Sequence, residues 1–119
     1  MPQIDGTRFG EITVGDNTYQ KDIYILTNGA ITKRKKALAR EAYGTSHKIG
    51  PSELKKVCQG HPKVIFVGVG HSGQAELTEE GRQFLKELGI ECLVKPTPEI
   101  VDSFNQCEKP KAALIHVAC

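Results

Sequence analysis

The sequence has no long hydrophobic run. No apolar segment approaches the roughly 20 residues that a membrane-spanning helix requires. The first residues, Met-Pro-Gln-Ile-Asp-Gly, contain neither the basic region nor the apolar core of a secretory signal peptide. We therefore expect a soluble, cytoplasmic protein.

Cysteine pairs and a strong charge of either sign are also missing. Cys58, Cys92, Cys107 and Cys119 include no C-x-x-C pair, so we expect reduced thiols or packing residues. Cys58-x-x-His61 has no second pair with ligand spacing, and we predict neither a metal nor a cofactor. Cys119 would be reactive only if it were exposed beside a cation. The net charge of +2 is too small for the whole molecule to attract nucleic acid.

The composition that remains is that of one ordinary globular domain. With 119 residues, 39% hydrophobic and 25% charged, the chain can bury one core, so we expect a single domain over residues 1–119. Its centre is the apolar run Val64-Ile65-Phe66-Val67, which leads into a glycine-rich turn. A continuous apolar run is typical of a strand buried on both faces, and open α/β sheets bind ligands where such strands end.

The first third of the chain predicts an antiparallel β-meander. We expect strands over Arg8–Val14, Tyr19–Thr27 and Ala30–Lys35. Turn residues separate them at Gly15-Asp16-Asn17 and at Asn28-Gly29, which tolerates the positive φ values of a type I′ hairpin. After the third strand we expect an irregular excursion or a single helical turn over the sheet.

The second half alternates helices and strands. The β-α-β-α-β order that follows from Val64 indicates crossover connections and a largely parallel sheet. Within the last strand, His116 is expected to be buried with one ring nitrogen satisfied. Thr97 is expected to cap the last helix. The predicted elements are helices beginning at Pro51, Thr78 and Thr97, with Leu77, Phe84, Leu85 and Leu88 on the inner face of the second, and strands Ile90–Val94 and Ala112–Ala118.

Two segments are candidates for binding a small anion. Gly68-x-Gly70-x-x-Gly73 has the form of a dinucleotide fingerprint, but no helix begins directly after it, so a tight turn with a backbone nest is the alternative. Thr45-Ser46-His47 sets two hydroxyls beside an imidazole, which suits either a nucleophile–base site or a polar turn. The candidate ligand-binding residues are Thr45, Ser46, His47, Gly68, Gly70, His71, Ser72 and Gly73; no complete catalytic constellation is present.

A basic cluster is the third candidate. It would serve as a partner surface, as an RNA site that tracks phosphates, or as a solvated edge that discourages strand aggregation. Only Tyr43 is available for base stacking, whereas single-strand binders interleave several aromatic residues with basic ones. The cluster consists of Lys33, Arg34, Lys35, Lys36 and Arg40.

Several motifs together resemble one small α/β family. This family includes the adipogenesis-associated domain protein and mitochondrial respiratory complex I assembly factor 3, and the chain is most similar to its uncharacterised archaeal members. The resemblance covers essentially the whole chain. Its motifs are Arg8-Phe9-Gly10, Asp22, Asn28-Gly29, Tyr43-Gly44-Thr45-Ser46-His47, Val67-Gly68-x-Gly70 and Ile115-His116-Val117-Ala118-Cys119.

The resemblance implies a three-layer α/β fold. A central mixed sheet would be covered by helices and lie beside an N-terminal antiparallel meander, with at least one strand of the sheet running against the others. The family has no established enzymatic activity, and its eukaryotic members are discussed as assembly or regulatory factors. Val69 stands where relatives often carry a hydroxyl residue, which argues against a ligand contact through that hydroxyl.

Three functions follow as hypotheses. We expect a non-catalytic binding or assembly module with a protein partner. The alternative is a protein or enzyme that binds a small anionic ligand at the turn Gly68–Gly73 near Ser46 and His47. The second alternative is RNA binding through the segment Lys33–Arg40.

Overall fold

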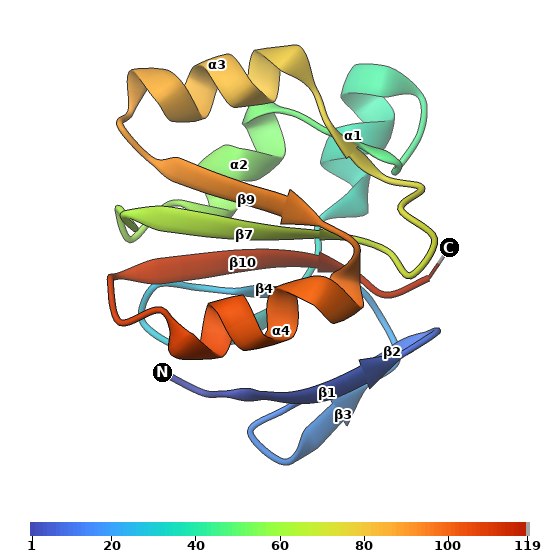
Figure 1. The fold of residues 1–119 in the computed structure, drawn as a ribbon. Coiled ribbons are helices and arrows are strands. Elements are labelled where there is room, and N and C mark those ends of the chain that lie inside the picture. The colour runs from blue at the N-terminus through green and yellow to red at the C-terminus, as the bar shows by residue number, and fades with distance from the viewer. Residues whose placement is uncertain (119) are drawn as a thin grey trace.

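The computed structural model describes residues 1–118, in which a mixed central sheet lies between two layers (Figure 1). The strand order in this sheet is β5-β4-β10-β7-β9. Strands β7 (Val64–Val69), β9 (Glu91–Lys95) and β10 (Lys111–His116) are parallel. Strands β4 (Ile23–Ile25) and β5 (Ile31–Lys33) form the antiparallel part. The predicted mixed sheet is confirmed.

Strand β7 is the centre of the core, as its apolar run predicts. All six of its residues are buried, and it has a parallel neighbour on each side. Ile65 and Val67 belong to the core on one face of the sheet, and Val64 and Phe66 belong to the core on the other. Full burial of one such side chain contributes roughly 1.5–3 kcal/mol, which favours an apolar residue at every position of a doubly covered strand.

The N-terminal meander is a separate sheet, made of β1 (Ile4–Arg8), β2 (Glu11–Val14) and β3 (Asn17–Tyr19). Figure 1 shows it below the central sheet, on the same side as α4. The expected single strand Arg8–Val14 was wrong at its start. Gly10, with a φ of +86°, turns the chain there, and the preceding strand β1 was missed.

The expected strand Tyr19–Thr27 was also wrong. The chain leaves the meander after Tyr19 and enters the central sheet at Ile23, so this segment supplies residues to two sheets. Residues 20–22 between the two strands make that change of sheet. The Asn28-Gly29 turn is confirmed, because Gly29 has a φ of +88° and β4 pairs antiparallel with β5.

Helices cover both faces of the sheet. Figure 1 shows α1 (Lys36–Tyr43), α2 (Pro51–Val57) and α3 (Glu79–Glu87) on one side and α4 (Thr97–Gln106) on the other. The predicted layers are therefore confirmed. A short parallel pair, β6 (Lys48–Ile49) with β8 (Glu76–Leu77), connects the upper layer.

Three local expectations about the helices need correction. Helix α1 is a regular eight-residue helix, whereas an irregular excursion or a single turn was expected. Thr97 does not cap α4; it is the first helical residue, and its hydroxyl bonds elsewhere. Leu88 is 56% exposed, because α3 ends before it and Gly89 turns the chain away with a φ of +70°.

Two remaining expectations concern the membrane and the C-terminus. Within residues 1–118, no helix combines the length and the apolar character needed to cross a membrane. Cys119 lies outside the described residues, so the expectation about its thiol stays a prediction.

Candidate functional site

A cluster of buried charges lies at the carboxyl end of the parallel strands, between the sheet and α2. Its hub is Arg34, which follows β5 and is only 2% exposed. The Arg34 guanidinium donates from Nε to Glu53 Oε2 at 2.6 Å and from Nη2 to Glu53 Oε1 at 2.9 Å. Its Nη1 donates to Asp22 Oδ2 at 2.9 Å, and Tyr24 also donates to Glu53, at 2.7 Å. Such a fork of hydrogen bonds offsets the cost of placing these charges in the interior.

Asp22 connects this cluster to His116. Because β4 runs antiparallel to β10, the residue that precedes β4 lies beside the residue that ends β10. His116 Nδ1 lies 2.7 Å from Asp22 Oδ2, and the Val117 amide donates to Oδ1 at 2.9 Å. Burial alone would raise the pKa of Asp22, but the hydrogen bonds from His116, Val117 and Arg34 and the charge of His116 lower it from 3.8 to about 2.

His116 is buried with one nitrogen satisfied, as expected. An ionised Asp22 only accepts hydrogen bonds, so Nδ1 of His116 carries the proton between them. Its Nε2 is buried and has no hydrogen-bond partner among the described residues. The ring of His47 lies edge-on to that of His116, with centroids 5.5 Å apart. The two imidazoles therefore meet beside the charge cluster.

The Thr45-Ser46-His47 bend is held by backbone contacts. The Ser46 carbonyl accepts from Arg34 Nη2 at 2.7 Å, and Thr45 Oγ1 accepts from the His47 amide at 3.2 Å. The His47 carbonyl accepts from the Glu76 amide at 2.8 Å, next to the β6–β8 pair. Thr45 thus makes the local hydrogen bond of a polar turn, while Ser46 and His47 join the buried cluster.

The glycine turn after β7 makes its contacts within the fold. The Gly70 amide donates to Thr97 Oγ1 at 3.0 Å, and the Gly70 carbonyl accepts from the amides of Thr97 and Gly73. His71 contacts the Val117 carbonyl at 3.1 Å through Nδ1. The amide of Gly70 is therefore not directed at a bound anion.

Gly68 has a packing role in the same turn. A Cβ atom at this position would lie 2.8 Å from Thr97 Oγ1 and 3.3 Å from Ile100 Cδ1. The glycine lets α4 approach the end of β7. Thr97 also donates to the His116 carbonyl at 2.6 Å, so this threonine is the physical connection between the turn and the buried histidine. Ser72 and Gly73 are exposed beyond it.

The basic surface lies on the other side of Arg34. It surrounds a hollow of about 330 Å³ at the junction of β5 and α1. Arg34 itself is buried and ion-paired, so it is not part of any exposed partner surface; this corrects the sequence-based cluster by one residue. We define the basic surface as the four remaining cations, Lys33, Lys35, Lys36 and Arg40.

Most of the charge on the basic surface is uncompensated. Lys36 Nζ lies 3.7 Å from Asp22 Oδ2. Within residues 1–118, no carboxylate oxygen lies within 4.0 Å of the charged nitrogens of Lys33, Lys35 or Arg40. Strand β5 is also the end of the sheet, so this positive charge borders an open strand edge.

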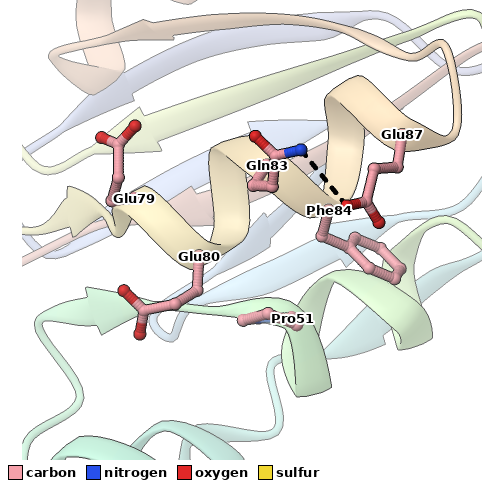
Figure 2. Close-up of a pocket in the computed structure, with 6 residues that line it drawn as sticks. All are labelled: Pro51, Glu79, Glu80, Gln83, Phe84 and Glu87. Atoms are coloured by element: carbon pink, nitrogen blue, oxygen red, sulfur yellow. Dashed lines mark hydrogen bonds between the residues drawn. The ribbon is translucent and has the colours of Figure 1, made fainter.

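A second hollow, of about 500 Å³, lies between α2 and α3. Figure 2 shows Pro51 and Phe84 on the sides that face each other, with three carboxylates and Gln83 along α3. Gln83 donates to Glu87 Oε1 at 3.2 Å. We call this hollow the acidic groove; its residues are Pro51, Glu79, Glu80, Gln83, Phe84 and Glu87.

The cysteines show no arrangement for metal binding. Among residues 1–118, no three His, Cys, Asp or Glu side chains are grouped to hold a metal ion. Cys58, Cys92 and Cys107 are free thiols. Burial raises the pKa of the Cys58 thiol to about 11, which makes it a weak nucleophile near neutral pH.

Residues 4–116 match a family described as "Protein of unknown function (DUF498/DUF598)". The chain belongs to this family. Conserved hypothetical protein PH1505 from Pyrococcus horikoshii OT3 is 32% identical, with a TM-score of 0.90 over 98% of this chain and 99% of that one. The solved structure named "MT938" is 30% identical, with a TM-score of 0.87 over the full length of both chains.

A more distant DUF498/DUF598-like fold is a Bordetella pertussis protein described as a Mth938-like domain. It is 15% identical, with a TM-score of 0.66 over 98% of this chain and 85% of that one, and it shows the fold alone. The predicted similarity to archaeal proteins is confirmed by PH1505 and MT938. The resemblance to the adipogenesis-associated domain protein and the complex I assembly factor stays a prediction.

Sequence reasoning missed two members of the buried cluster in this DUF498/DUF598 chain. Tyr24 lies in an apolar strand and Glu53 in the first turn of a helix, where both residues have ordinary explanations. One signal was present: Glu53 precedes the buried Val57 by four residues and so lies on the inward face of α2. A carboxylate on such a face requires a buried cation, and only the fold identifies it as Arg34.

Proposed function

We propose that this protein is a non-catalytic, cytosolic binding module that holds an acidic segment of a partner protein on its basic surface. The observation that carries the proposal is the hollow at β5 and α1. Every residue that lines it is a lysine or an arginine except Ala37. Since Arg34 is neutralised inside by Asp22 and Glu53, the remaining cations are the ones available to carboxylates from outside.

The open edge of β5 supports the same proposal. Ile31 and Lys33 lie opposite Ile25 and Ile23 in the antiparallel pair, and β5 has no further neighbour in the sheet order. An extended segment can add to such an edge by main-chain hydrogen bonds, while nearby charges select its sequence. Lys33 and Lys35 flank the buried Arg34 and are exposed, so they favour a segment rich in Asp and Glu.

The family resemblance supports an assembly role rather than a catalytic one. The relatives suggested by the sequence motifs are discussed as assembly or regulatory factors. The alternative, a small-anion site at Gly68–Gly73, has less support because the Gly70 amide is bonded to Thr97 and Gly68 is required for packing against α4. RNA binding has less support because no aromatic residue lines the basic hollow.

The test is fluorescence anisotropy with a labelled acidic peptide of about ten residues at low salt, where surface charges are least screened. The charge reversal Lys35→Glu with Lys36→Glu is expected to weaken binding by at least about tenfold. Lys55→Glu with Lys56→Glu is the matched control: it reverses two adjacent exposed lysines on α2, away from the hollow, and is expected to leave affinity within about twofold.

Three outcomes would contradict the proposal. One is a flat titration with the wild-type protein. Another is equal weakening by the two double variants, because that would show attraction to net charge without a defined surface. The third is tighter binding of a single-stranded RNA of the same charge, which would favour the nucleic-acid alternative.

A further inference from the structure

The acidic groove carries charge that the fold does not explain. Glu79 and Glu80 lie in the first turn of α3, where carboxylates stabilise the positive end of the helix dipole. Glu87 lies at the opposite end of the helix, where the dipole disfavours a carboxylate. Within the described part of the chain, no cationic nitrogen lies within 4.0 Å of any of these three carboxylates.

The groove also has the apolar surface that a long cationic side chain requires. Phe84 is half-buried between α2 and α3, and Pro51 lies across from it (Figure 2). A lysine or arginine can lay its aliphatic stem on such a surface, with its charge over the aromatic ring and its N–H groups donating to carboxylates around the rim. The groove therefore suits a cluster of Lys and Arg side chains.

The same chain presents such a cluster. We infer that the acidic groove of one copy binds the basic surface of a second copy. Three uncompensated carboxylates face the four cations Lys33, Lys35, Lys36 and Arg40, so the two surfaces are complementary in charge. This inference rests on the proposed function, because it names a second copy of the chain as an acidic partner of the basic surface.

The two surfaces are different parts of the molecule, so the contact is heterologous. The basic surface lies at β5 and the start of α1, whereas the acidic groove lies between α2 and α3. Each copy therefore uses one surface of each kind, and the copies associate head to tail in a ring or an open chain. Because the contact is mainly between charges near solvent, raising salt from about 0.1 M to about 1 M weakens it.

Sedimentation velocity of the full chain tests the inference by exchanging the charges. Glu80→Lys with Glu87→Lys makes the groove positive, and Lys35→Glu with Lys36→Glu makes the basic surface negative. Each double variant alone carries two surfaces of like charge and is expected to sediment as a monomer. An equimolar mixture is expected to associate again, since each variant then supplies the surface that the other requires.

Restoration in the mixture cannot come from misfolded protein. The variant Lys55→Glu with Lys56→Glu is the control: it has the same net charge as the basic-surface variant and is expected to associate by itself like the wild type. A wild-type protein that stays monomeric at millimolar concentration and low salt overturns the inference. So does a mixture of the two variants that stays monomeric.

The acidic peptide separates this inference from the proposed function. A wild-type protein that binds the peptide through Lys35 and Lys36 and yet stays monomeric keeps the proposed function and removes the second copy as its partner. A monomeric protein that also ignores the peptide removes both. If both hold, adding the peptide to the assembly is expected to return it to monomers, because peptide and groove compete for one surface.

Discussion

Neighbouring residues of one segment have opposite fates in this protein. Arg34 lies inside the molecule, bonded to Asp22, Glu53 and the Ser46 carbonyl, while Lys33 and Lys35 on either side of it are exposed. Alternation along an extended chain turns successive side chains to opposite sides, which explains the separation. The comparison teaches that a run of basic residues can hold an interior charge and an exterior binding surface at once.

The two regions differ in what their charges do. Inside, each charge depends on the others, because removing one partner leaves another without compensation in a poorly solvated place. Outside, water and salt screen each lysine, and its loss changes stability little. We therefore expect variants of the buried cluster to change folding, and variants of the basic surface to change binding.

Arg34→Ala is the largest test of this difference. It leaves the buried carboxylates of Asp22 and Glu53 without their cation, and we expect a loss of about 3–5 kcal/mol in the free energy of unfolding. Lys33→Ala is the matched control and is expected to change it by less than about 0.5 kcal/mol. Urea unfolding at neutral pH measures both. Equal losses for the two variants would remove the distinction between the regions.

Acid unfolding is the second test. The pKa of Asp22 is about 2 in the folded protein and 3.8 ordinarily, so its ionised form favours folding. That contribution, about 2 kcal/mol, is fully present above about pH 4 and is lost as the pH falls through about 2.

Asp22→Asn removes the titrating group and is expected to flatten this part of the stability profile. Unfolding by urea, measured at several pH values between about 4 and 2, gives that profile for wild type and variant. Asp102→Asn, which removes an exposed carboxylate on α4, is the control and should follow the wild type. A profile for Asp22→Asn with the wild-type slope would mean that other carboxylates govern acid unfolding.

Tyr24→Phe is the smallest of the three tests. Its hydroxyl donates to Glu53 at 2.7 Å and accepts from the Lys35 amide at 3.2 Å, so it connects the interior cluster to the basic surface. We expect a loss of about 1.5 kcal/mol, because a buried hydrogen bond to a charged group disappears. Tyr43→Phe, whose half-buried hydroxyl bonds Thr78 and Glu80, should lose less. Thermal unfolding of both variants ranks them, and the reverse order would contradict the difference in burial.

Local patterns predicted the elements that form from neighbouring residues. The apolar run Val64–Val67, the Asn28-Gly29 turn and the capping by Thr78 of α3 all appear in the structure. Division of the chain between sheets was not predicted. Residues 20–22 contain no strong turn signal, and their path is determined by Asp22, which the cluster holds beside His116.

The candidate site was predicted in part. The bend at Ser46 and His47 does lie near the end of the parallel strands, but its neighbour there is His116, not the amides of the glycine turn. Gly68 and Gly70 fit a ligand fingerprint by spacing alone, yet each is explained by the approach of Thr97. Spacing along the chain could not reveal that α4 occupies the place where a phosphate was considered.

The sequence by itself determined the alternation of strands and helices, the doubly buried central strand and the family, because these depend on patterns between near neighbours. Only the tertiary structure decided which charges are inside. Asp22, Arg34, Glu53 and His116 come from four separate elements or their ends, and their pairing depends on distances that strand order and helix packing create. A charge is stable in the interior only with a partner at hydrogen-bond distance, and that partner is a property of the fold.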